Sequence, residues 1–346
     1  MKQLPPDTPE QSLITQYKGP RLVVKAYAGT GKTTTLVKYA HNNLDSRILY
    51  LAYNRAIRDE AREKFPANVD CKTSHQLAYA TIGRGYQHKL SGNLRLTDIA
   101  QAVNTKNWTF AKDILDTLNA FMCSADMRIL YTHFARADTG KVLTSKQERY
   151  QIQVVEGAEL IWKRMTNVQD PFPTVHDCYL KQYQLGMPNL SRRYTTILFD
   201  EAQDANPVTS SIVLQQNCKV ILVGDRHQQI YRFRGANNAL DSKELMNADQ
   251  LYLTHSFRFG PNVSLVANAL LELKGETRPV VGRGPADQVL MFLPGDVGHR
   301  AILHRTVMGV IETALSATES GAQVFWVGGI DAYQINELQD LYWFSM

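Results

Sequence analysis

Residues 21–33 read RLVVKAYAGTGKT, an apolar run that leads directly into a glycine-rich turn. The apolar run, 21–26, predicts a short buried strand, and the residues over 32–43 carry helical apolar spacing. The next apolar segment, 47–53, predicts a second strand, and a helix over 54–64 follows it. Strands that alternate with helices at this spacing predict a parallel sheet with helices on both of its faces.

The alternating pattern stops and returns later in the chain. A further helix is predicted to begin near Ser74, after which strand signals are absent over 84–190 while helical spacing persists. Strands are predicted again at 195–200, 219–225 and 251–255. The simplest organisation is one α/β domain, 1–83 and 191–256, interrupted by a helical insertion over 84–190.

The C-terminal part, 257–346, carries the signals of a second α/β unit. A helix is predicted over 261–274, and a second helical stretch follows later. Strand-like runs occur at 289–293, 301–306 and 322–329. We therefore expect the start of a second α/β domain over 257–346.

The composition excludes several classes of protein. Hydrophobic residues make up 44% of the 346 residues and charged residues 21%, so the chain can form cores and is not a disordered tail. No apolar run has the roughly 18–20 residues of a transmembrane helix, and two prolines interrupt the N-terminus where a signal peptide is apolar. The four cysteines and nine histidines show no zinc-site spacing. We expect a soluble intracellular protein with no membrane partner and no structural metal.

The net charge of +5 is concentrated in the predicted insertion. Residues 84–195 contain 15 Lys and Arg against 10 Asp and Glu, while the rest of the chain has 23 of each. This excess fits either a solvated helical surface or a domain that faces a polyanion.

The glycine-rich turn has the composition of a phosphate-binding loop. The segment Ala26-Tyr-Ala-Gly-Thr-Gly-Lys-Thr33 lies between a predicted strand and helix, so its backbone N–H groups can hold phosphate groups. Lys32 can reach the β- and γ-phosphates, and the Thr33 hydroxyl can bind Mg²⁺. The usual pattern begins with glycine, where this chain has Ala26. The loop residues expected to hold the nucleotide are Ala28, Gly29, Thr30, Gly31, Lys32, Thr33 and Thr34.

An acidic motif, Asp200-Glu-Ala-Gln-Asp204, directly follows the apolar run ILF. An acidic residue at the end of a neighbouring strand holds Mg²⁺ beside such a loop, and Asp200 fits that role. A carboxylate can also orient and deprotonate an attacking water, which is the role we expect for Glu201. The two motifs together predict a protein that binds and hydrolyses a nucleoside triphosphate.

A third motif completes the set, Gly224-Asp-Arg-His-Gln-Gln-Ile-Tyr-Arg-Phe-Arg-Gly-Ala236. The three motifs together resemble superfamily 1A (UvrD/Rep-type) DNA helicases, whose long GDxxQxIYxxRGA motif the third block matches. Two further segments, CKTSH at 71–75 and HDCYLK at 176–181, are most similar to the F-box DNA helicase branch. The resemblance extends from Gln11 to about residue 330. It implies a RecA-like P-loop NTPase domain with a helical insertion, followed by the start of a second RecA-like domain.

The resemblance also implies ATP and Mg²⁺ as cofactors and assigns roles around them. Gln11 is similar to the glutamine that reads adenine, with an ordinary surface glutamine as the alternative. Gln228 is similar to the residue that senses the γ-phosphate and couples it to DNA. Arg258 resembles the arginine that reaches the γ-phosphate from the far side of the cleft, and Phe257 would stack on adenine. Catalytic roles are therefore expected for Lys32, Asp200, Glu201, Gln228 and Arg258, with Mg²⁺ on Thr33 and Asp200.

For DNA, the resemblance implies contacts from three motifs. Aromatic faces hold single strands without reading their sequence, and Phe233 stands where many relatives carry a stacking tryptophan. The residues expected to contact DNA are Tyr53, Asn54, Arg55, Thr73, His75, Tyr231, Phe233 and Arg234. We interpret His176 and Asp177 as structural or close to DNA, because no partner histidines have metal-site spacing.

The chain departs from the family in one respect. A TxHxxKG-like stretch and a VxxTRA-type segment, both in the family's second motor domain, do not occur before Met346. We therefore expect a motor truncated before its last two motifs, which binds ATP with Mg²⁺ and hydrolyses it slowly.

The resemblance implies a 3′→5′ DNA helicase or translocase with a role in DNA repair or recombination. Its partner would be single-stranded DNA or a single/double-strand junction, and its motor would act as a monomer. Two alternatives stay open: a nucleic-acid-binding module that holds ATP without turnover, and a P-loop ATPase switch that acts on a protein. We expect a cytoplasmic location for a bacterial or phage protein and a nuclear one for a eukaryotic protein.

Overall fold

A computed structural model describes the chain over residues 6–135, 143–229, 238–292 and 298–333. The chain divides into two compact units, Met1–Gln288 and Val289–Met346. Three residues expected to contact DNA, Tyr231, Phe233 and Arg234, lie outside the described residues.

The first unit is built on a six-stranded sheet in which all neighbouring strands are parallel. The strands are β1 (Arg21–Ala26), β2 (Ile48–Ala52), β3 (Val69–Thr73), β4 (Thr196–Phe199), β5 (Lys219–Gly224) and β6 (Asp249–Leu253). They lie in the order β3-β2-β4-β5-β1-β6. The five strands predicted in this unit are all present, and the predicted α/β architecture with a parallel sheet is confirmed.

One strand, β3, has no counterpart among the predicted strands. Its sequence, VDCKT, carries only two apolar residues, Val69 and Cys71. It lies at the edge of the sheet and pairs with β2 alone. An edge strand is less enclosed than a central strand, so its sequence lacks the continuous apolar run that marked the others.

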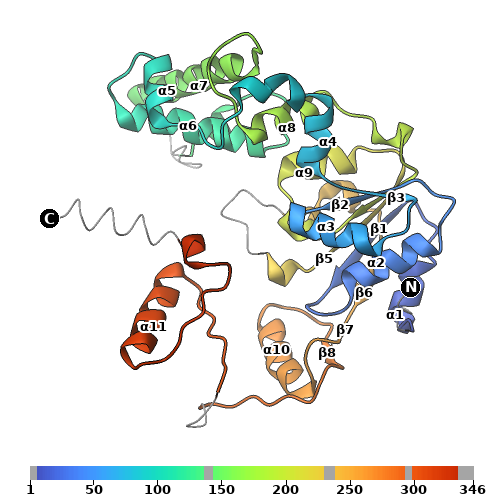
Figure 1. The fold of residues 1–346 in the computed structure, drawn as a ribbon. Helices are drawn as coiled ribbons and strands as arrows, with labels where there is room; N and C mark the ends of the chain where they lie inside the picture. The colour runs from blue at the N-terminus through green and yellow to red at the C-terminus, as the bar shows by residue number, and fades with distance from the viewer. Residues whose placement is uncertain (1–5, 136–142, 230–237, 293–297, 334–346) are drawn as a thin grey trace. The chain divides into compact units, whose positions relative to one another are not determined.

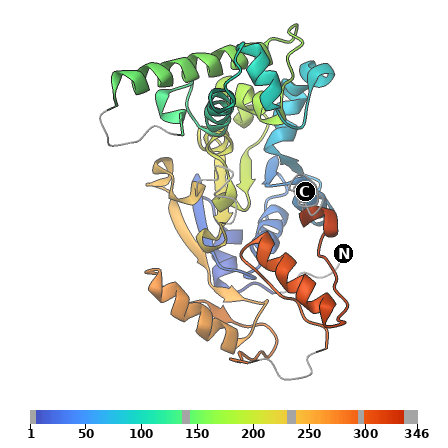
Figure 2. The same ribbon diagram turned by 90° about the vertical axis from the view of Figure 1, so that its left-hand side faces the viewer.

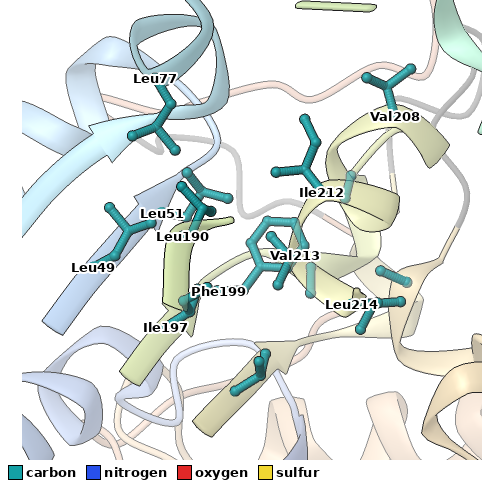
Figure 3. Packing of buried hydrophobic residues seen from close by; sticks show 14 of the residues in the cluster. Leu49, Leu51, Leu77, Leu190, Ile197, Phe199, Val208, Ile212, Val213 and Leu214 are labelled. Carbon is teal, nitrogen blue, oxygen red and sulfur yellow. The ribbon is translucent and has the colours of Figure 1, made fainter. Parts of the chain in front are cut away.

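Alternate side chains of the strands enter two different cores. Val23, Leu49 and Leu51 pack on one face against α4 (Ser74–Thr81), α8 (His176–Leu185) and α9 (Pro207–Leu214), as Figure 3 shows for part of this core. Leu22, Val24 and Tyr50 pack on the other face against α1 (Pro9–Thr15), α2 (Lys32–His41) and α3 (Arg55–Lys64). This two-residue alternation fixes the sheet between two helical layers (Figure 1).

The helical insertion has a core of its own. Its helices α5 (Leu96–Ala102), α6 (Trp108–Cys123) and α7 (Ser145–Thr166) bury residues such as Ile114, Phe121 and Ile161 against one another. They lie beside α8 and apart from the sheet in both views (Figures 1 and 2). Among the described residues, no helix has the length and apolar character that a membrane span requires.

Two buried lysines hold the ends of the long helices of the insertion. The ammonium group of Lys181 donates to the backbone carbonyls of Ser124 and Asp126, which follow α6. Lys89 donates to the carbonyls of Arg164, Asn167 and Asp170 at the end of α7. Cations are stabilised at a helix C-terminus, where unpaired carbonyl groups point outward.

Short 3₁₀ turns connect the larger elements. They are η1 (Gly83–Lys89), η2 (Tyr131–His133), η3 (Leu190–Arg192), η4 (Ala202–Asp204), η5 (Arg226–Gln228), η7 (Ala239–Asp241), η8 (Lys243–Leu245) and η9 (Ile330–Tyr333). After β6 the first unit continues with β7 (His255–Ser256), α10 (Pro261–Leu273) and β8 (Val281–Gly282), and β7 pairs with β8.

The second unit contains one α-helix in its described part, α11 (Val307–Glu319). The strands predicted at 289–293, 301–306 and 322–329 are wrong over the described residues, which form no strand there. Their apolar side chains are exposed instead: Phe292 is 86% exposed, Leu303 93% and Phe325 89%. A strand requires a hydrogen-bonded neighbour, and an apolar run alone does not supply one. The predicted domain boundary after residue 256 stays a prediction.

Candidate nucleotide site and nucleic-acid interface

The glycine-rich loop joins β1 to the N-terminus of α2. Gly29 and Gly31 have φ angles of +73° and +78°, in the left-handed region that favours glycine. A Cβ on Gly29 would lie 2.5 Å from Cβ of Arg258 and 2.7 Å from Oγ of Ser256, so no larger residue fits there. The loop thus presents backbone N–H groups at a helix N-terminus, which is an anion-binding geometry.

The acidic motif lies directly opposite this loop. Nζ of Lys32 is 3.5 Å from Oε1 of Glu201, and the Thr33 hydroxyl donates to Oδ2 of Asp200 at 2.9 Å. Tyr50 donates to the same Asp200 oxygen at 2.8 Å. The structure therefore brings together four of the residues that the sequence predicts for the phosphate and Mg²⁺ site.

The electrostatic environment of Asp200 is unusual for a carboxylate. It is 1% exposed. Burial raises the pKa of Asp200 above its usual range, and the negative charge of Glu201 adds to the effect. The hydroxyls of Tyr50 and Thr33 and the ammonium group of Lys32 act in the opposite direction. A buried carboxylate of this kind is stabilised by a bound cation, so the donor set fits Mg²⁺.

Glu201 is held in a specific and strained conformation. Its φ of +50° is in the left-handed region, which is uncommon for a residue with a side chain. Nε2 of Gln203 donates to Oε2 of Glu201 at 2.8 Å, and the side-chain oxygen Oε1 of Gln203 accepts from the backbone N–H of Asp225 at 3.0 Å. Gln203 was not among the predicted site residues. Its place in the same motif, two positions after Glu201, was the sequence feature that could have indicated a role in the site.

Asp225 links the acidic motif to the predicted γ-phosphate sensor. Its carboxylate accepts from Nε2 of Gln228 at 2.5 Å and from the backbone N–H of His227 at 2.9 Å. Both residues belong to η5, which follows β5. Gln228 is therefore fixed at the same edge of the sheet as Glu201.

Gln11, Phe257 and Arg258, which the sequence predicts to contact adenine or the γ-phosphate, lie near the glycine-rich loop. Gln11 is 4% exposed and forms a capping box with Thr8, so it is not a surface side chain, and its contact with adenine stays a prediction. Both Gln11 and Phe257 lie beside Gly31. A Cβ placed on Gly31 would be 3.1 Å from Nε2 of Gln11 and 4.0 Å from the ring of Phe257. The backbone N–H of Phe257 donates to the carbonyl of Gly29 at 2.9 Å. Arg258 follows with an exposed side chain.

The remaining loop residues surround the same turn. The hydroxyl of Thr30 donates to the carbonyl of Tyr27 at 2.9 Å, which closes the loop on itself. Ala28 and Thr34 are partly buried beside it. A small pocket near the loop is lined by residues that include Tyr27, Asp225 and His227.

The predicted DNA-contacting residues gather at a second position on the same sheet edge. Asn54 precedes α3 and its side chain accepts from the backbone N–H of Ile57, while Thr73 caps α4 in the same manner. Thr73 is 5% exposed, so its hydroxyl acts mainly as a helix cap. Tyr53 is partly buried and Arg55 is exposed at the N-terminus of α3.

The pair His176–Asp177, at the start of α8, joins this group. Nε2 of His75 lies 3.0 Å from Oδ1 of Asp177, and Nδ1 of His176 lies 2.9 Å from the hydroxyl of Tyr179. Burial lowers the pKa of His176, and the nearby charges of His75 and Arg55 contribute in the same direction. The N-termini of three helices and the side chains of Arg55, His75 and His176 therefore lie close together, an arrangement that offers hydrogen-bond donors to phosphate groups.

Asp177 is the acidic member of this group. Its pKa lies below the usual range, chiefly because His75 donates a hydrogen bond to it. The described part of the chain contains no cluster of three or more His, Cys, Asp or Glu side chains arranged to hold a metal ion.

Comparison with known proteins gives a consistent result. A family model described as the UvrD/REP helicase N-terminal domain matches residues 7–245. F-box DNA helicase 1 of Gallus gallus is 35% identical over 357 aligned residues, which cover 97% of this chain and 34% of the chicken protein.

Two further relatives extend the comparison. F-box DNA helicase protein 1 of Schizosaccharomyces pombe is 36% identical over 80% of this chain and 34% of its own length. ATP-dependent DNA helicase PcrA of Leuconostoc citreum is 26% identical over 80% of this chain and 40% of its own length. The chain spans about a third of the length of the two F-box helicases that it matches.

Proposed function

The chain belongs to the UvrD/REP helicase family, and we propose that it hydrolyses ATP and couples hydrolysis to movement along single-stranded DNA. The observation that carries this proposal is the pair of contacts between the glycine-rich loop and the acidic motif. Lys32 faces Glu201 and Thr33 is hydrogen-bonded to Asp200, so a phosphate-binding loop and two carboxylates share one site.

Nucleotide binding would use the loop, Lys32 and Gln11. The N–H groups at the start of α2 and the Lys32 ammonium group would neutralise the phosphates, because both place positive charge at the loop. Gln11 would donate from its side-chain Nε2 to adenine, since its side-chain oxygen Oε1 already accepts from the backbone N–H of Thr8 at 3.1 Å. Phe257 is 46% exposed and its ring would supply a stacking surface.

Hydrolysis would depend on the carboxylates. Thr33 and Asp200 would hold Mg²⁺, which when bound neutralises charge on the phosphate oxygens. Glu201 would orient the attacking water and accept its proton, because it is the partly exposed carboxylate next to the buried one. Gln203 would keep Glu201 in place through its 2.8 Å hydrogen bond.

Two residues would connect hydrolysis to DNA. Gln228 would respond to the γ-phosphate, because its amide is held by Asp225 at the edge of the same site. Arg258 would approach the γ-phosphate with a guanidinium group that stays charged and offers several donors. Its backbone lies against Gly29, so a change at Arg258 would reach the loop directly.

DNA would bind across the N-termini of α3, α4 and α8, where Arg55, His75 and His176 can contact phosphates. We also propose, from the family alone, that Tyr231, Phe233 and Arg234 contact the strand, with movement in the 3′→5′ direction. Binding would be insensitive to sequence and would weaken with salt, because backbone phosphates supply the contacts.

The test is ATP hydrolysis by the chain with and without a single-stranded oligonucleotide, with Lys32→Ala as the control for contaminating ATPase. We expect DNA to stimulate turnover several-fold, and we expect the control to be inactive with and without DNA. Turnover that is indifferent to DNA would favour a switch acting on a protein. DNA binding without any turnover would favour a binding module.

A further inference from the structure

An acidic residue outside the three motifs, Glu276, touches the turn that carries Gln228. Glu276 follows α10, and Gly275 between them has a φ of +78°, which only glycine adopts readily. The backbone N–H of Glu276 donates to the carbonyl of Leu271 at 3.0 Å. This helix-ending turn fixes where the Glu276 side chain can reach.

Glu276 contacts both residues that precede Gln228. Its Oε1 is 3.0 Å from Nε2 of His227 and 3.4 Å from a terminal nitrogen of Arg226. The side chains of Glu276 and His227 are 22% and 17% exposed. A hydrogen bond that is this well shielded is stronger than one on an open surface. Arg226 is 53% exposed and contributes less.

The phosphate loop holds the other side of His227. The rings of His227 and Tyr27 stack with centroids 6.3 Å apart and an angle of 24° between their planes. The hydroxyl of Tyr27 donates to the carbonyl of Arg278 at 2.5 Å. Burial raises the pKa of Tyr27 to about 12, with the charge of Glu276 as the next contribution. His227 therefore lies between the loop and the segment 276–278.

The position of His227 affects that of Gln228, because the two residues are neighbours in η5 and share a hydrogen-bond acceptor. The backbone N–H of His227 and the side-chain amide of Gln228 both donate to Asp225. The turn η5 is thus held from inside the site by Asp225 and from outside by Glu276. A three-residue 3₁₀ turn has few hydrogen bonds of its own, so its position depends on contacts such as these.

We propose that Glu276 is a positioning residue that fixes the turn carrying Gln228, and thereby sets the preference of the site for a nucleoside triphosphate over a diphosphate. This inference rests on the proposed function. Glu276 acts through His227 and touches no reacting atom. Losing it should loosen Gln228, which would contact only the γ-phosphate, and should leave the contacts to adenine and the other phosphates unchanged.

The experiment compares the parent chain with Glu276→Ala, Glu276→Gln, His227→Ala, the Glu276→Ala/His227→Ala double variant and the matched control Glu272→Ala. Glu272 is an exposed glutamate at the end of the same helix. Calorimetric titration with Mg-ADP and with the Mg-bound β,γ-imido analogue of ATP gives the triphosphate preference of each variant. Steady-state hydrolysis gives kcat and KM separately.

We expect Glu276→Ala to lose about tenfold in triphosphate preference and in kcat, the scale of one charge-assisted hydrogen bond. Its affinity for ADP should stay within about twofold, because no diphosphate contact is lost. Glu276→Gln should retain most of the preference, since its amide oxygen still accepts from His227. Glu272→Ala should behave as the parent.

Three results would overturn the inference while leaving the proposed function intact. They are an unchanged preference in Glu276→Ala, an equal loss of ADP and triphosphate affinity, and losses in Glu276→Ala and His227→Ala that simply add in the double variant. A parent chain that binds neither nucleotide would overturn the proposed function and this inference together.

Discussion

The hydroxyl group of Thr33 lies 2.9 Å from Oδ2 of Asp200, although 167 positions separate the two residues. Thr33 belongs to the helix that follows β1, and Asp200 directly follows β4. Because the sheet is parallel, these segments meet at the same edge. Beside this contact, Nζ of Lys32 lies 3.5 Å from Oε1 of Glu201. We expect substitutions of these two residues to have different effects.

Lys32→Ala should lower ATP hydrolysis by a factor of about 10²–10³ or more, because removing a positioned charge from a reacting phosphate costs at least as much as one oxyanion donor. Steady-state ATPase assays check this. Lys64→Ala is the control, since Lys64 is half exposed on the surface of α3, where it pairs with Glu60. Equal rates in Lys32→Ala and the parent would contradict the assignment of the loop.

Glu201→Gln should keep nucleotide affinity and lower kcat by about 10²–10⁴, because the amide can still accept a hydrogen bond but no longer takes a proton. Binding of the β,γ-imido analogue and kcat are measured on the same preparation. Glu63→Gln, an exposed position of α3, serves as the control. A loss of nucleotide binding in Glu201→Gln would show that Glu201 is structural.

Arg55→Ala and His75→Ala should each weaken binding of single-stranded DNA of any sequence. Removing the permanent charge of Arg55 should reduce the magnitude of the slope of log K against log salt by about 0.7, whereas His75→Ala removes a hydrogen-bond donor and should lower the affinity with little change in slope. Fluorescence anisotropy with a labelled oligonucleotide at several salt concentrations measures this slope. Lys64→Ala, at the other end of α3, should leave it unchanged. An unaltered slope in Arg55→Ala together with an unaltered affinity in His75→Ala would place the DNA path elsewhere.

The sequence was sufficient to predict most of the sheet and that the glycine-rich loop and the acidic motif lie together. The strands β1, β2, β4 and β5 are continuous apolar runs because they are enclosed on both faces. The loop and the acidic motif are short and local, so their chemistry is visible in the residues themselves. The contacts of Lys32 and Thr33 with the acidic motif follow from the parallel topology that these runs predict.

Other features depend on contacts between distant residues. His75 and Asp177 are 102 positions apart, and their contact could not be read from either segment. By contrast, the helix cap at Thr73 could have been predicted locally, because Gln76 stands three positions later and the pair matches the capping-box pattern. Glu276 lies in no motif, and only the fold brings it to His227. The runs after residue 289 failed as strands because apolar composition does not provide a pairing partner.

The last prediction concerns Lys181, which is fully buried in the insertion. Its ammonium group donates to the carbonyls of Ser124 at 2.8 Å and Asp126 at 2.6 Å and lies 4.4 Å from the ring centre of Phe121. Burial lowers the pKa of Lys181 to about 8 from an ordinary value of 10.5, and the nearby charge of Asp126 offsets part of this effect.

Between these two pKa values the unfolded chain binds more protons than the folded chain, so the free energy of unfolding should rise with pH. Relative to Lys181→Met, the parent should gain about 2 kcal/mol between pH 7 and pH 9.5, at 1.36 kcal/mol per pH unit above the folded pKa. Urea denaturation at the two pH values measures this difference. The control Lys112→Met, on the exposed face of α6, should depend on pH as the parent does.

A second measurement does not require that Lys181→Met folds. The side-chain nitrogen resonance of Lys181 in the parent should titrate near pH 8. A midpoint above pH 10 would show that burial does not disfavour the charged form of this lysine.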